Sequence, residues 1–215
     1  MNRADPQRDL VVRILQQAGA TPGSPALTSV SRGVTRTYAQ TVQDARTVAA
    51  KVRSVAHRGD RVILLSDDEP EAYIGLLGCA LAGVVPAVVD AASPAATVAA
   101  GADAVGAVAV VTGEGLSPVP SVPGLPVLTV SNTPGDGTTV PDHTDDDAAP
   151  DSPLLMLFTS GTTGVPKSVV LSRSALHAIP DALRQHGLDW ITWIPGEPIY
   201  TPLPAAHIGG VWWIL

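Results

Sequence analysis

The residues best suited to chemistry form one short segment, Thr159-Ser160-Gly161-Thr162-Thr163-Gly164-Val165-Pro166-Lys167, which follows an apolar run at 154–158. Glycines let backbone N–H groups approach a ligand closely, and four hydroxyl groups and one ammonium group add side-chain donors. Concave arrays of such donors bind anions. The segment therefore predicts a loop that holds a triphosphate or a pyrophosphate.

Two other interpretations of this segment are a P-loop and a surface turn without a ligand. Residues 161–168 almost fit the P-loop pattern G-x-x-x-x-G-K-[ST], but Pro166 stands where the second glycine is needed. Proline has no N–H and a fixed φ, so it cannot replace that glycine in a phosphate cradle. A plain surface turn does not account for the Pro-Lys ending or for the apolar runs on both sides, at 154–158 and 169–171.

A second candidate lies at Leu203-Pro204-Ala205-Ala206-His207-Ile208-Gly209-Gly210. An isolated histidine is most often a hydrogen-bonded loop residue. Here Pro204 fixes the approach to the turn, and Gly209 removes side-chain bulk where a substrate could lie against the backbone. The segment is therefore a candidate substrate pocket, with His207 and Gly209 as its contacts.

Composition excludes several classes of function. Charged residues make up 15% of the chain, the net charge is −7, and no basic cluster is present, which disfavours nucleic acid or an anionic membrane as a partner. Cys79 is the only cysteine and lies in an apolar run, so we expect a buried thiol in a reducing, cytoplasmic compartment. Residues 72–89 carry no charge, but three glycines and Pro86 interrupt them, which favours a buried helix and strand over a membrane span.

Hydrophobic periodicity predicts an α/β fold with a doubly wound, mostly parallel sheet and flanking helices. We expect helices at 9–18, 41–55, 70–82 and from 93, a hairpin at 26–38, and strands at 61–65, 84–89, 107–112, 127–130, 154–158 and 169–171. The predicted division is a βαβ subdomain at 1–112, a Pro/Gly/Asp-rich linker region at 113–153, and the loop and pocket segments at 154–215.

The loop also carries a family resemblance. Every position of 159–167 agrees with the signature loop of the AMP-forming adenylating enzymes: acyl-CoA synthetases, luciferases and peptide-synthetase adenylation domains. Ser168 is the nearby departure, because glycine is usual there. Residues 37–40 and 82–90 resemble two further elements of that family, in the expected order along the chain. The N-terminal part of the large domain of an adenylating enzyme is therefore the expected fold.

Within that family, the 203–210 segment resembles the Leu-Pro-x-[Phe/Tyr]-His-x-x-Gly pattern of acid–CoA ligases, whose histidine lines the acyl pocket. Ala206 replaces the usual aromatic residue, and Ile208 stands where fatty acyl-AMP ligases place aspartate. The resemblance therefore favours an acid–CoA ligase. An amino-acid or aryl-acid adenylation domain that loads a carrier protein, and a non-catalytic nucleotide-binding remnant, remain as alternatives.

The resemblance implies ATP, Mg²⁺ and either coenzyme A or carrier-protein phosphopantetheine as cofactors, with a small carboxylic acid as substrate. It assigns phosphate binding to Thr159, Ser160, Gly161, Thr162, Thr163, Gly164 and Lys167, with Thr159 and Lys167 also catalytic. The family's adenine- and ribose-binding segments and its C-terminal lid would follow this stretch. We therefore expect a truncated chain that needs a complementing C-terminal segment for activity and binds ATP no tighter than about 1 mM.

Overall fold

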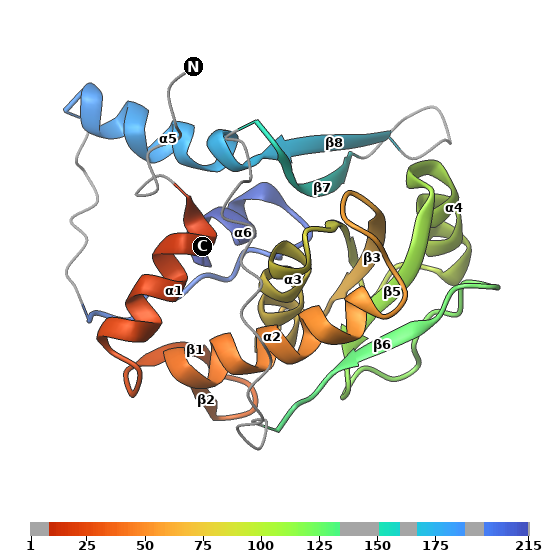
Figure 1. Cartoon of the computed structure of the whole chain (residues 1–215), viewed down its shortest axis with the longest axis horizontal. Coiled ribbons are helices and arrows are strands. Elements are labelled where there is room, and N and C mark those ends of the chain that lie inside the picture. The colour runs from red at the N-terminus through yellow and green to blue at the C-terminus, as the bar shows by residue number, and fades with distance from the viewer. Residues whose placement is uncertain (1–8, 134–150, 160–166, 188–195, 215) are drawn as a thin grey trace.

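The strands of the chain form one large mixed sheet and one small hairpin (Figure 1). The computed structural model describes residues 9–133, 151–159, 167–187 and 196–214. Within them, six strands lie in the order β6-β5-β3-β4-β7-β8, and only the β7–β8 pair is antiparallel. These strands are β3 (Arg61–Ser66), β4 (Val85–Asp90), β5 (Ala107–Gly113), β6 (Val127–Val130), β7 (Pro153–Thr159) and β8 (Lys167–Ser172). The predicted α/β class with a mostly parallel sheet is confirmed.

Helices join the parallel strands as the alternating pattern requires. α3 (Pro70–Ala82) connects β3 to β4, and α4 (Ala95–Val105) connects β4 to β5. The other helices are α1 (Leu10–Ala20), α2 (Tyr38–Arg53), α5 (Arg173–Gln185) and α6 (Ile208–Ile214), and the separate hairpin is β1 (Pro25–Ser29) with β2 (Val34–Thr37). The expected helices and strands are all present, with small differences at their ends.

Side chains on the central strands alternate between two hydrophobic cores. On β3, Val62 and Leu64 belong to the core beneath α1, α2 and α3, whereas Ile63 and Leu65 belong to the core beneath α4. Successive side chains of a strand point to opposite faces, so a strand that is covered on both faces is continuously apolar. This burial explains why β3 and β4 appear in the sequence as unbroken apolar runs.

Helix α3 accounts for most of the uncharged stretch at 72–89. Every residue from Pro70 to Ala82 is buried, because α3 packs between the sheet and α2. Gly83 then ends the helix in the left-handed conformation, at φ 74°, and the chain turns directly into β4. Among the described residues, no helix has both the length and the apolar character needed to cross a membrane.

The start of α2 differs from the sequence-based expectation for a local reason. The helix begins at Tyr38 rather than at 41, because Thr37 and Gln40 form a capping box. The Gln40 backbone N–H donates to Thr37 Oγ1 at 3.3 Å, and the Thr37 N–H donates to Gln40 Oε1 at 2.9 Å. These bonds satisfy two of the amides that a helix start otherwise leaves unpaired.

The sheet joins segments that are distant in the sequence. β6, which the sequence predicts within the 113–153 region, pairs in parallel with β5, and the Lys51 ammonium of α2 donates to the Thr129 carbonyl at 2.7 Å. β7 pairs in parallel with β4. Strands from 61–113 and from 153–172 therefore share one sheet, with β6 at one edge and β8 at the other.

Candidate active site at the carboxyl ends of the parallel strands

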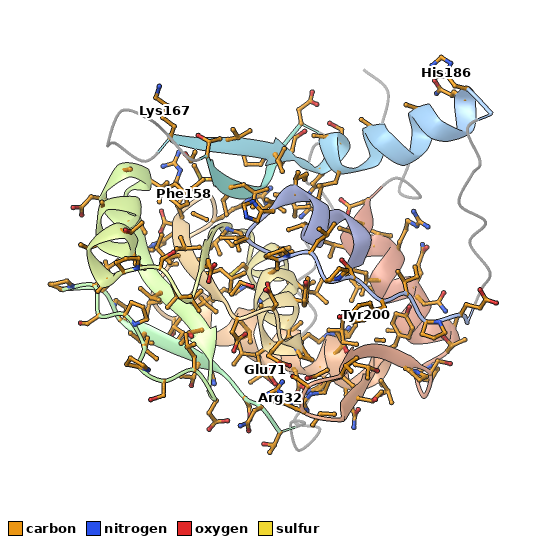
Figure 2. The ribbon with its side chains drawn as sticks, turned by 180° about the vertical axis from the view of Figure 1, so that it is seen from behind. Arg32, Glu71, Phe158, Lys167, His186 and Tyr200 are labelled. Atoms are coloured by element: carbon orange, nitrogen blue, oxygen red, sulfur yellow. The ribbon has the colours of Figure 1, made fainter. Side chains whose placement is uncertain are left out.

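The two described ends of the candidate phosphate loop lie side by side. β7 and β8 pair so that Thr159 is opposite Lys167, and Thr159 Oγ1 donates to the Lys167 carbonyl at 3.3 Å. Both residues are exposed, and Figure 2 shows the Lys167 side chain at the tip of the molecule, away from the core. A mobile ammonium group on an exposed strand end can reach a phosphate as a point charge.

The loop itself, with the candidate contacts Ser160, Gly161, Thr162, Thr163 and Gly164, lies outside the described residues. Ser168, the departure from the family pattern, lies in β8 opposite Phe158. Its φ is not in the left-handed region, so serine is not strained at this position.

Phe158, the only phenylalanine of the chain, lies near the end of β7, next to Thr159. Its ring packs against α4 at Gly101, where an added Cβ would lie 3.2 Å from the ring. Figure 2 shows Phe158 below Lys167, next to α4. Gly101 therefore lets the residue just before the loop lie close to the helix.

The register of the sheet brings several loops to one side. In β3 and β4, Ser66 lies opposite Asp90, and in β4 and β7, Val88 lies opposite Leu157. The parallel strands β3, β4 and β7 therefore end at the same side of the sheet, which we call the carboxyl rim. Ligands of open α/β sheets bind outside this rim. The loop that follows Thr159 begins there.

The 203–210 segment reaches the same rim. The Ala205 backbone N–H donates to Asp68 Oδ1 at 2.8 Å, and Asp68 lies two residues after the end of β3. Only β4 separates β3 from β7, and neighbouring strands lie ~4.8 Å apart, so the ends of β3 and β7 are roughly 10 Å apart. His207 is exposed and Gly209 is half-buried. The structure thus places Thr159 and Lys167, the described ends of the first segment, on the same side of the sheet as the 203–210 segment.

Carboxylates at the carboxyl rim are a feature that the sequence analysis missed. Asp67 is half-buried, and its pKa is raised by burial and by the nearby charges of Glu71 and Glu69, although backbone hydrogen bonds oppose the shift. Asp68 accepts from the Ala205 N–H, and Asp90 accepts from the Ala92 N–H at 2.8 Å. Polar residues directly after buried parallel strands were the signal that could have identified these positions.

Comparison with known proteins shows which family the chain belongs to. The model of the family described as AMP-binding enzyme matches residues 14–215. The chain is 38% identical to the fatty acid–[acyl-carrier-protein] ligase MmaC of Mycobacterium marinum and 36% identical to the medium/long-chain-fatty-acid–[acyl-carrier-protein] ligase FadD10 of Mycobacterium tuberculosis. Each match covers 94% of this chain and 40% of the relative. The chain therefore spans about two fifths of the length of these relatives.

Solved structures agree on the fold. The N-terminal domain of FACL13 from Mycobacterium tuberculosis superposes with a TM-score of 0.70 at 21% identity, over 96% of this chain and 54% of that one. The nonribosomal peptide synthetase FmoA3 superposes with a TM-score of 0.70 at 26% identity, over 84% of this chain and 19% of that one. With the family model matching nearly the whole sequence and the predicted loop beginning at the carboxyl rim, the chain belongs to the family of AMP-binding adenylating enzymes.

Proposed function

We propose that this chain forms the phosphate- and acyl-binding part of an AMP-forming ligase that activates a fatty acid and passes it to a carrier-protein thiol. The supporting observation is the exposed Thr159–Lys167 strand pair, which closes a loop of the family's pattern at the carboxyl rim. The names of the relatives that match 94% of the chain favour a fatty acid as substrate and an acyl carrier protein as acceptor.

The first step that this assignment requires is adenylation. A carboxylate oxygen of the acid bonds to the α-phosphorus of ATP, the bond from that phosphorus to the bridging oxygen breaks, and pyrophosphate leaves. Negative charge accumulates on the leaving group, so donors that are fixed around it lower the barrier. We assign that role to the hydroxyl groups of Thr159, Ser160, Thr162 and Thr163, the amides of Gly161 and Gly164, and the Lys167 ammonium group. Mg²⁺ bound to the phosphates would neutralise further charge.

The second step is thioester formation. The sulfur of a phosphopantetheine thiolate bonds to the acyl carbon, and AMP leaves. We assign His207 and Gly209 to the acyl side of the site, because the Ala205–Asp68 bond holds their segment at the rim beside the loop. The aliphatic and small residues at 203–210 offer an apolar surface for an acyl chain.

The test is fatty-acid-dependent exchange of radiolabelled pyrophosphate into ATP. The assay should use a protein that joins this segment to the counterpart of the relatives' remaining length. We expect Lys167→Ala to reduce the exchange rate by about 10²–10³-fold, as the loss of one charge-stabilising donor does in other enzymes. The sequence has two lysines, so Lys51→Ala is a matched control. Lys51 is bonded to the Thr129 carbonyl on the far edge strand, and its loss should leave exchange unchanged.

The acceptor is tested separately by mass spectrometry of the products. We expect acylation of a holo carrier protein to exceed formation of acyl-CoA when both thiols are present at equal concentration. A product made only on coenzyme A would contradict the carrier-protein assignment and favour an acid–CoA ligase. Absence of exchange with fatty acids of every chain length would favour a nucleotide-binding remnant.

A further inference from the structure

Asp68 has an unusual backbone conformation. Among the residues that the structure describes, it is the only non-glycine residue with positive φ, at 63°. Aspartate tolerates this left-handed region better than most residues, but the conformation still persists only where surrounding contacts hold it. Asp68 lies in the short connection between β3 and α3, at the carboxyl rim.

The contacts that hold Asp68 connect it to the candidate pocket. Its Oδ1 atom accepts from the backbone N–H of Ala205, which lies 137 residues further along the chain, at 2.8 Å. Ser66 Oγ donates to the same carboxylate oxygen and accepts from the Asp68 N–H, both at 3.3 Å. Ala205 is 3% exposed, so its amide needs a protein acceptor. A carboxylate is a stronger acceptor than a neutral group.

The segment that follows Ala205 is a short turn that leads into α6 at Ile208, so its position depends on where it starts. The His207 N–H donates to the Pro204 carbonyl at 3.0 Å, and the Val211 N–H donates to the His207 carbonyl at 3.2 Å. An added Cβ on Gly210 would lie 2.1 Å from the Pro204 carbonyl oxygen, so only glycine fits there without movement of the backbone. With its internal spacing fixed in this way, the 204–211 segment moves as a unit when Ala205 moves.

We propose that Asp68 is a positioning residue for the acyl side of the site: its carboxylate fixes Ala205 and thereby sets His207 and Gly209 at the carboxyl rim. This inference rests on the proposed function for the meaning of the pocket, but the contact itself is testable without any activity. Asp68 is solvent-exposed as a residue, which leaves it accessible from the rim while Oδ1 holds the buried amide.

The test compares amide hydrogen exchange in the 215-residue chain and in two variants. Asp68→Gly removes the acceptor and suits the positive φ, so it isolates the lost hydrogen bond from backbone strain. Asp68→Asn keeps an oxygen acceptor and also tolerates that φ. We expect amide exchange at 205–211 to rise at least about tenfold in D68G, which loses the whole bond, and by a smaller factor in D68N, which loses only the charge of the acceptor. Exchange in β3, β4 and β5 should not change.

Asp60→Gly is the matched control, since Asp60 precedes the same strand at its opposite end and accepts from the His57 N–H at 2.7 Å. It should leave 205–211 unaffected. Unchanged exchange at 205–211 in D68G, or a rise of equal size throughout the sheet, would overturn the proposal. If D68G does not fold, D68N decides, because asparagine tolerates the same φ and its neutral acceptor should still raise amide exchange at 205–211 above the wild-type rate; no rise would overturn the proposal.

A second measurement connects the contact to substrate use, in the joined protein described above for pyrophosphate exchange. We expect D68G to raise KM for the fatty acid at least about tenfold while KM for ATP changes less than about twofold, and D68N to raise KM for the fatty acid by a smaller factor. Equal changes for both substrates would overturn the pocket role. Complete absence of pyrophosphate exchange in the wild-type joined protein would contradict the proposed function. The amide hydrogen exchange of the 215-residue chain would still decide whether Asp68 positions the turn.

Discussion

Replacing Glu71 with Gln should destabilise the chain strongly, because it removes the charge that two arginines share. Glu71 lies in the first turn of α3 and is 2% exposed. Its Oε2 atom accepts from Arg32 at 2.5 Å, and its Oε1 atom lies 3.6 Å from Arg36, which is fully buried. Figure 2 shows Arg32 and Glu71 together at the end of the molecule opposite Lys167. These ion pairs connect the β1–β2 hairpin to α3.

The loss in free energy of unfolding depends on the polar partners that Arg36 retains when Glu71 becomes neutral. Removing one partner of a buried ion pair costs about 3–5 kcal/mol. Arg36 still lies 3.5 Å from Asp44 and donates to the Ser131 carbonyl at 3.3 Å, so the lower end, about 3 kcal/mol, applies. For a chain of this length each kcal/mol lowers the midpoint temperature by about 2–4 °C, which gives a fall of roughly 6–12 °C.

The assay is urea unfolding followed by far-UV circular dichroism, with thermal unfolding as a second measure. Glu69→Gln is the matched control, because Glu69 pairs with the same Arg32 at 3.1 Å but its side chain is 21% exposed. An ion pair that water reaches contributes at most about 1 kcal/mol, so E69Q should change stability far less than E71Q. Equal, small effects of both variants at an unchanged m value would refute the reasoning that burial makes this cluster costly to break.

Three further predictions concern packing, capping and pH. Gly78→Ala should lower the free energy of unfolding by about 1–3 kcal/mol, measured with urea, because the new Cβ would lie 2.6 Å from Val48 and force α2 away from α3. An unchanged free energy of unfolding would mean that α2 can shift from α3 at no cost. Thr37→Ala should cost about 1 kcal/mol by removing the capping box with Gln40, and Thr37→Ser should restore it. Burial raises the pKa of Cys79 to about 12, above the ordinary value of 9.0, so the thiol stays protonated in the fold while the unfolded chain ionises. Stability should therefore fall as the pH rises from about 9 to about 12, Cys79→Ala should reduce that slope, and an unchanged slope would contradict the assignment.

The local elements could be predicted because their causes are local. The apolar runs of β3 and β4 report burial on both faces, and Gly83 marks the end of α3 because only a residue that accepts positive φ fits there. The loop that ends at Lys167 could be proposed from residue types alone, since amides, hydroxyls and an ammonium group suit phosphate wherever the fold places them.

The arrangement of these elements could not be predicted in the same way. Nothing in the local pattern of β7 shows that it pairs with β4, or that β6 extends the sheet beyond β5. Long-range pairing depends on which surfaces remain to be covered after the helices pack, and on loop closure over many residues. The same holds for the cluster around Arg36, which joins side chains from the hairpin, α2 and α3.

By itself, the sequence determined the class of the fold and the family, and it suggested a chemistry for the loop, because each of these is carried by residues that are neighbours along the chain. Only the tertiary structure decided that the ends of β3, β4 and β7 share one rim and that Asp68 holds Ala205 there. Hydrogen bonding and packing act over a few ångströms in space, so a contact between residues 137 positions apart exists only once the sheet has brought them together.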